Sequence, residues 1–216
     1  MDDYIDIHSH NIPKIATTTI VNYRLGVDAL NFISEKYYSV GLHPWDINNC
    51  DITVLANQLK KLCQLPNVLA IGEIGLDKTI DIPLNAQIEV LIKQIKIAEE
   101  LQKPVIIHCV KAYNELIEQL KSSNTQWIFH GFNKNYEIAT DIINNGGIIS
   151  FGSAIITNKK QQEVLMQIPI SSFFLETDES NVLIEDIYEA VAQLLQIDIK
   201  DLKHIQKELF NKVFSK

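Results

Sequence analysis

Short apolar runs alternate with longer segments of helical period along most of this sequence. The apolar runs have the length of strands, and the segments between them repeat apolar residues at spacings of three and four. This alternation is typical of β-α-β units, in which helices cover a parallel sheet. We therefore predict an α/β fold.

Eight strands and seven helices are predicted. The strands are expected at residues 4–9, 17–23, 37–42, 68–73, 104–109, 126–131, 147–152 and 173–177, and the helices near 53–64, 84–102, 111–122, 135–145, 159–167, 185–196 and 200–214. This order predicts a (β/α)8 TIM barrel that forms a single domain over residues 1–216. The segment 11–16 is too short for a crossover helix, and 24–36 allows only a short one. We therefore expect the barrel to be slightly irregular and trimmed in its first βα units.

Composition and charge narrow the classes of partner. The 19 basic and 27 acidic side chains give a net charge of −8, without the clustered cations that broad nucleic-acid affinity requires. The apolar runs are shorter than the roughly 18 residues of a membrane span, and the N-terminus is acidic. We therefore expect a cytoplasmic protein with no membrane partner and no evident obligate protein partner. The spacing of Cys50, Cys63 and Cys109 fits neither a disulfide framework nor a zinc site, so free thiols are expected.

Histidines and acids close most of the strand-like runs. Five of the six histidines do so, and His204, on an amphipathic helix, is the exception. Acids occupy similar positions in AIGEIGLD and FFLETDES. Because the carboxyl ends of parallel strands converge on one face of a barrel, these side chains are expected to meet there. The residues concerned are His8, His10, His43, Glu73, His108, His130, Glu176 and Asp178.

This group of side chains has the composition of a metal site. His8 and His10 are two residues apart on a strand, so both can face one side while Ser9 faces away. Imidazole and carboxylate ligands suit Zn²⁺, Mn²⁺, Fe²⁺ or Co²⁺. Six candidate ligands exceed what one tetrahedral ion takes, which favours two ions bridged by a carboxylate. A single histidine at a strand end is more often a hydrogen-bonded core or rim residue, so the prediction depends on the whole group: His8, His10, Glu73, His108, His130 and Asp178.

Three further residues have alternative roles. Glu176 either supports the ligands, caps a helix or faces solvent. Trp45 and Tyr113 either stack on a substrate or, more commonly for aromatic side chains, pack in the core or its rim.

Six motifs resemble the TatD family of metal-dependent hydrolases, within the amidohydrolase-like metal barrels. They are DIHSH, VGLHPW, AIGEIGLD, KPVIIHC, FHGF and LETDES, and they run along most of the chain. The resemblance implies a TIM barrel with a dinuclear metal site that hydrolyses phosphodiester bonds, typically as a deoxyribonuclease. It also implies that His8, His10 and Asp178 hold one ion, that His108 and His130 hold the other, and that Glu73 bridges both.

The resemblance also implies a mechanism and its participants. A hydroxide activated by two divalent ions, drawn from Zn, Mg, Mn, Fe or Co, would attack phosphorus. Asp178 would orient it or accept its proton, and His43 would contact a substrate oxygen. The expected catalytic residues are therefore Asp178, Glu73 and His43, and the expected substrate is DNA or a small phosphodiester.

The sequence departs from the family pattern at several places. The segment between His10 and Gly41 is short, Val110 stands where members often carry arginine, and the loop after Glu-Thr-Asp is reduced to ESNVLIED. Lys111 either replaces the absent arginine or faces solvent. These departures keep open a dinuclear hydrolase of a small phosphoester, amide or lactone, and also a non-catalytic metal-binding barrel. The polymerase-and-histidinol-phosphatase group also opens with His-x-His, but it does not explain GEIGLD or the Glu-Thr-Asp motif.

Overall fold

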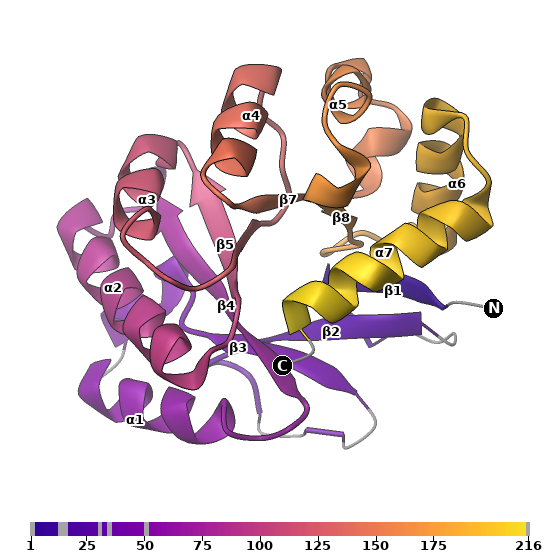
Figure 1. Ribbon diagram of the computed structural model, residues 1–216. Helices are drawn as coiled ribbons and strands as arrows, with labels where there is room; N and C mark the ends of the chain where they lie inside the picture. Colours follow the sequence, from indigo (N-terminus) through magenta and orange to yellow (C-terminus); the bar gives the residue numbers. More distant parts are fainter. Residues whose placement is uncertain (1–2, 13–16, 30–31, 34–35, 50–51, 215–216) are drawn as a thin grey trace. The chain divides into compact units, whose positions relative to one another are not determined.

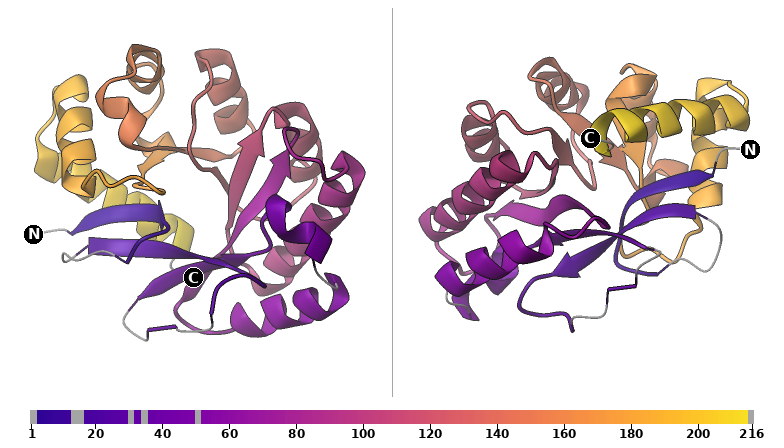
Figure 2. Two further views of the ribbon diagram at one scale, coloured as in Figure 1. Left: turned by 180° about the vertical axis from the view of Figure 1, so that it is seen from behind. Right: turned by 60° about the horizontal axis from the view of Figure 1, so that its bottom comes forward.

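The computed structural model describes residues 3–12, 17–29, 32–33, 36–49 and 52–214 (Figures 1 and 2). Strands and helices alternate in the predicted order, and the order of the strands in the sheet follows that of the chain. The strands are β1 (Tyr4–Ser9), β2 (Thr17–Arg24), β3 (Tyr37–Gly41), β4 (Val68–Asp77), β5 (Val105–Val110), β6 (Trp127–Phe129), β7 (Ile148–Phe151) and β8 (Phe173–Leu175). The helices are α1 (Ile52–Leu62), α2 (Leu84–Leu101), α3 (Tyr113–Leu120), α4 (Tyr136–Asn144), α5 (Lys159–Leu165), α6 (Ile184–Leu195) and α7 (Ile199–Phe214).

The chain forms two compact units. Unit 1 consists of Met1–Val21 and His130–Lys216, and unit 2 consists of Asn22–Phe129. Each unit contains parallel strands and the helices that follow them. The prediction of a single domain over residues 1–216 stays a prediction.

Unit 2 is built on β3 to β6. β3 pairs in parallel with β4, β4 with β5, and β5 with β6. Nine of the ten residues of β4 are buried, as is typical of a parallel strand covered on both faces. Helix α2 packs against β4 (Figure 1). At Gly75, with φ of 155°, an added Cβ would lie 2.0 Å from the His108 carbonyl oxygen, so only glycine allows β4 to approach β5 this closely.

Unit 1 combines an N-terminal and a C-terminal segment of the chain. β1 pairs in parallel with the first residues of β2, and β7 pairs in parallel with β8. Helices α6 and α7 both pack against β1 (Figure 1). The Tyr188 hydroxyl of α6 donates to the Ile5 carbonyl at 3.0 Å and accepts from the Ile5 N–H at 3.0 Å. Ile5 and Tyr188 are fully buried, so the Tyr188 hydroxyl and the Ile5 backbone groups satisfy one another inside the core.

All eight predicted strands and all seven predicted helices are present, with ends that differ by up to four residues. Between β1 and β3, none of the described residues is helical, which confirms the trimmed start of the fold. Helix α2 begins at Leu84, as predicted, directly after Pro83, which has φ of −54° and ψ of 134°. Among the described residues, three short 3-10 helices were not predicted, because segments this short have no clear period. They are η1 (Pro44–Asn49), η2 (Ser153–Ile156) and η3 (Ile170–Ser172).

Candidate metal centre

In unit 1, the end of β1 and the segment after β8 bring two histidines to one carboxylate. The Nε2 atoms of His8 and His10 each lie 3.6 Å from Oδ1 of Asp178. The backbone fixes this arrangement: Asp178 N–H donates to the His8 carbonyl at 2.9 Å, and His10 N–H donates to the Asp178 carbonyl at 3.1 Å. The three side chains can present ligand atoms within 4.8 Å of one another. They form one group capable of holding a metal ion.

Asp6 and Thr177 connect the two segments beneath this group. Thr177 donates to the Asp6 carboxylate twice, from its N–H at 3.0 Å and from Oγ1 at 2.7 Å. Its hydroxyl also lies 2.9 Å from Oγ of Ser9. Burial outweighs these hydrogen bonds and raises the pKa of Asp6 to about 7. The first acid of DIHSH therefore anchors the residue that precedes Asp178.

Glu176 lies at the centre of a second group in unit 1. It is fully buried, and its carboxylate accepts from the Gly131 N–H at 2.6 Å and from the Ser150 hydroxyl at 2.5 Å. Nδ1 of His130 lies 3.6 Å away. Burial raises the pKa of Glu176, but interactions with His130, His8 and Ser150 outweigh burial and hold it below its usual range. His130, Glu176 and Asp178 can present ligand atoms within 4.8 Å of one another.

Unit 2 holds a further group around Glu73. Oε1 of Glu73 lies 2.7 Å from Nδ1 of His108 and 3.2 Å from Nε2 of His43. Asn22 orients the acid, because its Oδ1 accepts from the Glu73 N–H at 2.9 Å and its Nδ2 donates to Oε2 at 3.5 Å. Burial lowers the pKa of His43 and outweighs the opposing effect of Glu73. His43, Glu73 and His108 form a third group with ligand atoms within 4.8 Å.

Asp77 and Trp45 extend the group in unit 2. Nε1 of Trp45 donates to Oδ2 of Asp77 at 2.8 Å, and the same oxygen lies 3.6 Å from Nε2 of His108. Thr79 donates to Oδ1 from its N–H at 2.8 Å and from its hydroxyl at 2.5 Å. Burial raises the pKa of Asp77, but these hydrogen bonds and His108 together lower it below its ordinary value. Asp77 therefore adds a negative charge beside His108.

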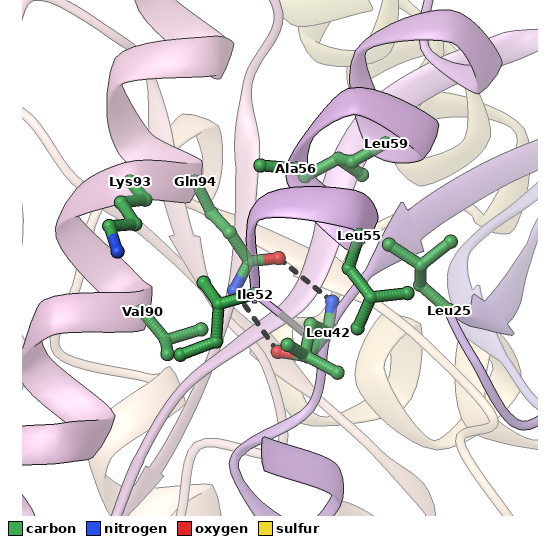
Figure 3. Close-up of a pocket in the computed structure, with 9 residues that line it drawn as sticks. All are labelled: Leu25, Leu42, Ile52, Leu55, Ala56, Leu59, Val90, Lys93 and Gln94. Carbon is green, nitrogen blue, oxygen red and sulfur yellow. Dashed lines mark hydrogen bonds between the residues drawn. The ribbon is translucent and has the colours of Figure 1, made fainter. Parts of the chain in front are cut away.

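Two buried glutamines of α2 hold the backbone around this group. Gln94 pairs with both backbone groups of Leu42, the residue before His43, in a small apolar pocket that includes Leu55 and Val90 (Figure 3). Gln87 pairs in the same way with Asp77, at 2.8 and 2.9 Å. Because Gln87 and Gln94 are seven residues apart, they lie on one face of the helix.

The structure therefore distributes the predicted site residues over two units. Unit 1 brings together His8, His10, His130 and Asp178, and unit 2 brings together His43, Glu73 and His108. Glu73 does not close its strand as predicted, because β4 continues to Asp77. Their convergence on one mouth, the ligand assignment and the bridging role of Glu73 stay predictions.

Several supporting residues were missed or left open. The possibility that Glu176 faces solvent is wrong, since it is fully buried. Four further supporting residues were not predicted: Asn22, Asp77, Gln87 and Gln94. Of these, only Asp77 had a signal, because it closes the GEIGLD motif.

The remaining candidate residues have ordinary environments. His204 is exposed on α7, with Nε2 3.6 Å from Oε1 of Glu208. Neither Cys63 nor Cys109 forms a disulfide bond within the described residues, and Cys50 lies outside them. The Tyr113 ring packs 6.1 Å from that of Phe129, centroid to centroid. Lys111 is exposed, with φ of 53°.

The fold and these groups define a class: α/β barrels that bind metal ions through histidines and carboxylates at their strand ends. The family model described as TatD related DNase matches residues 16–215. This chain belongs to the TatD family of metal-dependent hydrolases.

Individual relatives agree with this assignment. The chain is 30% identical over 207 residues to the uncharacterized metal-dependent hydrolase BU355 of Buchnera aphidicola, covering 83% of this chain and 77% of that protein. It is 28% identical over 208 residues to the uncharacterized metal-dependent hydrolase YabD of Bacillus subtilis, covering 86% and 81%.

Solved structures show the same fold. The TatD homologue YjjV of Escherichia coli superposes with a TM-score of 0.84 at 23% identity, covering 99% of this chain and 98% of that one. A TatD family hydrolase of Entamoeba histolytica gives a TM-score of 0.81 at 18% identity, covering 99% and 98%. The predicted (β/α)8 barrel class is confirmed. In the part of the chain that the structure describes, no helix is long and apolar enough to cross a membrane.

Proposed function

We propose that this protein hydrolyses phosphodiester bonds as a TatD-like deoxyribonuclease that uses two divalent metal ions. One observation carries the proposal: two imidazole nitrogens, from His8 and His10, lie at the same 3.6 Å distance from one oxygen of Asp178. Two histidines and a carboxylate are a ligand set that suits a catalytic transition metal. The family model supports the nuclease class.

The side chains present fit such ions. His8, His10 and Asp178 would hold one, in agreement with the sequence-based assignment. The resemblance implies that His108 and His130 would hold the second ion and that Glu73 would bridge the two ions. A bound divalent ion supplies a Lewis acid that polarises phosphoryl oxygens and makes water more acidic.

Residues of the chain would carry out the remaining steps. The Asp178 side chain is 38% exposed, so a substrate or a water molecule can reach its carboxylate. It would orient the attacking water and accept its proton. The buried Glu176 would fix His130, and Asn22 would fix Glu73. His43 would contact a substrate oxygen.

Elemental analysis and a matched set of assays test this proposal. Purified protein is analysed for bound metal, and it is then assayed on single-stranded DNA, bis(p-nitrophenyl) phosphate and a carboxylic ester with added Mg²⁺, Mn²⁺ or Zn²⁺. Diester hydrolysis that chelation abolishes and metal restores supports the proposal. His10→Gln should lose metal and activity, whereas His204→Gln on exposed α7 should keep both.

A small phosphoester is the second candidate substrate. It is favoured by the net charge of −8 and by Val110, a neutral side chain, at the end of β5. Faster turnover of a small diester than of DNA would select this candidate. Bound metal without hydrolysis of any substrate would instead indicate a non-catalytic metal-binding barrel.

A further inference from the structure

Arg24 is the only arginine among the 19 basic residues of this chain, and it is the last residue of β2. Its guanidinium group forms a bidentate ion pair with Asp46, in which Nε donates to Oδ2 at 3.0 Å and Nη2 donates to Oδ1 at 2.7 Å. Every other cation of the chain is a lysine, whose ammonium group cannot form such a planar contact. The single arginine therefore lies where bidentate geometry is used.

Arg24 lies beside the group of His43, Glu73 and His108 in unit 2. Asn22, whose Oδ1 accepts from the Glu73 N–H at 2.9 Å, is two residues earlier on the same strand. Side chains two residues apart on a strand leave it on the same face. Arg24 therefore shares the face of β2 that contacts Glu73, and it is nearer than Asn22 to the carboxyl end of the strand.

The backbone also connects Arg24 to His43. The ends of β2 and β3 meet, because the Leu25 N–H donates to the Gly41 carbonyl at 2.8 Å, and the Asp46 N–H donates to the His43 carbonyl at 3.0 Å. Burial is the main cause of the lowered pKa of His43, and the positive charge of Arg24 lowers it further. The guanidinium group is therefore close enough to act on His43 electrostatically, without a hydrogen bond between the two side chains in the described part of the chain.

Asp46 occupies only one edge of the guanidinium group. Nη2 donates to both carboxylate oxygens, whereas Nη1 has no hydrogen-bond partner among the described residues. Nη1 is also not one of the buried unpaired atoms, so solvent reaches it. The five N–H donors of arginine lie in one plane, so Nη1 keeps two donors for a second anion while Asp46 stays bound. A lysine paired with Asp46 would have no such second edge.

Phosphate is an anion that suits this free edge. Planar N–H donors match the geometry of phosphate oxygens, and such hydrogen bonds between charged groups are among the strong ones. Asp46 neutralises part of the guanidinium charge, so we expect the contact to distinguish between ligands and not to provide high affinity by itself. A phosphate held at Nη1 would lie beside His43, at the edge of the site in unit 2.

We propose that Arg24 binds a second phosphate of the substrate, next to the phosphate whose oxygen His43 would contact. The inference rests on the proposed function, because it concerns the choice among phosphodiester substrates at that same site. Substrates with two neighbouring phosphates, such as oligonucleotides, are then preferred over small diesters with one phosphate. Arg24 is thus a specificity-determining residue.

Nucleotides without a diester bond test this proposal independently of hydrolysis. Calorimetry on the full-length protein with added Mn²⁺ compares thymidine 3′,5′-bisphosphate with thymidine 3′-monophosphate and 5′-monophosphate. Wild type should bind the bisphosphate about tenfold more tightly than either monophosphate, which is the lower end of the range for a hydrogen bond between charged groups. Arg24→Gln should remove this preference. Lys60→Gln is the matched control, because Lys60 lies in the same unit and pairs with Glu100 at 2.5 Å.

Asp46→Asn separates phosphate binding from a purely structural ion pair between β2 and η1. This variant removes a negative charge beside the guanidinium group, so a phosphate-binding Arg24 should keep or strengthen the bisphosphate preference. An ion pair that only fastens η1 predicts that Arg24→Gln and Asp46→Asn weaken the preference equally, and this result would overturn the proposal. Equal affinity of wild type for the bisphosphate and the monophosphates would overturn it as well.

Two further measurements complete the test. Thermal unfolding of each variant identifies misfolding, and Arg24→Lys decides the result if Arg24→Gln does not fold. Arg24→Lys keeps the charge without the second edge, so it should lower the preference, and an unchanged preference would contradict the role of Nη1. Hydrolysis of bis(p-nitrophenyl) phosphate by wild type, a substrate with one phosphate, tests the proposed function alone. A bisphosphate preference without diester hydrolysis would support the phosphate site and contradict the nuclease.

Discussion

Gln94 satisfies both backbone groups of Leu42: it accepts from the N–H at 2.8 Å and donates to the carbonyl at 3.1 Å (Figure 3). Leu42 is 3% exposed, so solvent does not replace these bonds if they are lost. The next residue is His43, whose Nε2 contacts Glu73. A helix side chain therefore sets the position of a candidate catalytic residue that it does not touch.

Replacing Gln94 by methionine tests this role. Gln94→Met keeps the length of the side chain but leaves two buried backbone groups unpaired, at about 1–3 kcal/mol each. We expect the free energy of unfolding to fall by about 2–6 kcal/mol in urea denaturation. Gln193→Met, at an exposed site on α6, should change it by less than about 0.5 kcal/mol. Equal stability of the two variants would contradict the role of Gln94.

Thr177 gives a second test of a buried polar connection. Thr177→Val keeps the shape but removes the hydroxyl that donates to Asp6 at 2.7 Å. Above pH 8, where the Asp6 carboxylate is ionised, hydrogen bonds to charged groups contribute about 1.5–3 kcal/mol, so a loss of that size is expected in urea denaturation at that pH. Thr140→Val, on the exposed face of α4, serves as the control, and a loss no greater than that of the control would rule out a stabilising role for the Asp6 contact.

Two kinds of feature could be predicted from the sequence: strands and helices with a regular repeat of apolar residues, and polar side chains at the ends of strands. Buried strands such as β4 and long helices such as α2 repeat apolar residues over many positions, so tertiary packing and local pattern agree. His8, His10 and Asp178 could be found because chemistry-bearing side chains interrupt or follow apolar runs. The resemblance to the family motifs then assigned these residues to the ligand set of one metal ion.

The supporting residues could not be found in this way. Gln87 and Gln94 are polar side chains on the buried, largely apolar face of α2, and their partners are backbone groups 10 and 52 residues away. Asn22 lies within a strand and bonds a residue 51 positions later. A single sequence does not identify these hydrogen-bond partners, because hydrogen bonds between segments far apart in the chain produce no periodic pattern.

Asp178→Asn tests the proposed chemistry directly. Asparagine keeps the shape of the side chain, and it tolerates the left-handed backbone at this position, where φ is 54°. The amide neither carries the charge nor accepts the proton, so we expect diester hydrolysis to fall by at least about 10²-fold with thermal stability preserved. A folded variant with a rate within a few-fold of wild type would remove Asp178 from the mechanism.

Stability at alkaline pH should depend on Cys63. Burial raises the pKa of this thiol to about 12 from an ordinary value of 9.0. The folded state therefore favours the neutral thiol, and its contribution is complete below pH 9 and is lost as the pH rises from 9 towards 12. Between pH 8 and pH 10, wild type should lose about 1.4 kcal/mol more than Cys63→Ala in urea denaturation. Parallel pH profiles for the two proteins would show that this thiol does not titrate on unfolding.

DNA cleavage should be weak and sensitive to salt, because this chain has a net charge of −8. Val110 ends β5 where the family resemblance leads us to expect arginine, and the exposed Lys111 follows with φ of 53°. If Lys111 replaces that arginine, its ammonium group contacts one phosphate as a point charge and does not form the bidentate hydrogen bonds of a guanidinium. Lys111→Gln should then reduce the slope of log affinity against log salt for single-stranded DNA by about 0.7.

Lys93→Gln is the matched control for this measurement, because Lys93 lies on α2 of the same unit and pairs with Glu89 at 2.7 Å. Binding and cleavage are compared at low and moderate salt with the metal concentration held constant, since divalent ions also screen phosphate charge. A reduced slope in Lys111→Gln alone would place a DNA phosphate at the end of β5. Fast cleavage that neither substitution nor salt affects would show that the argument from charge is wrong and would favour an ordinary family nuclease over the small-phosphoester alternative.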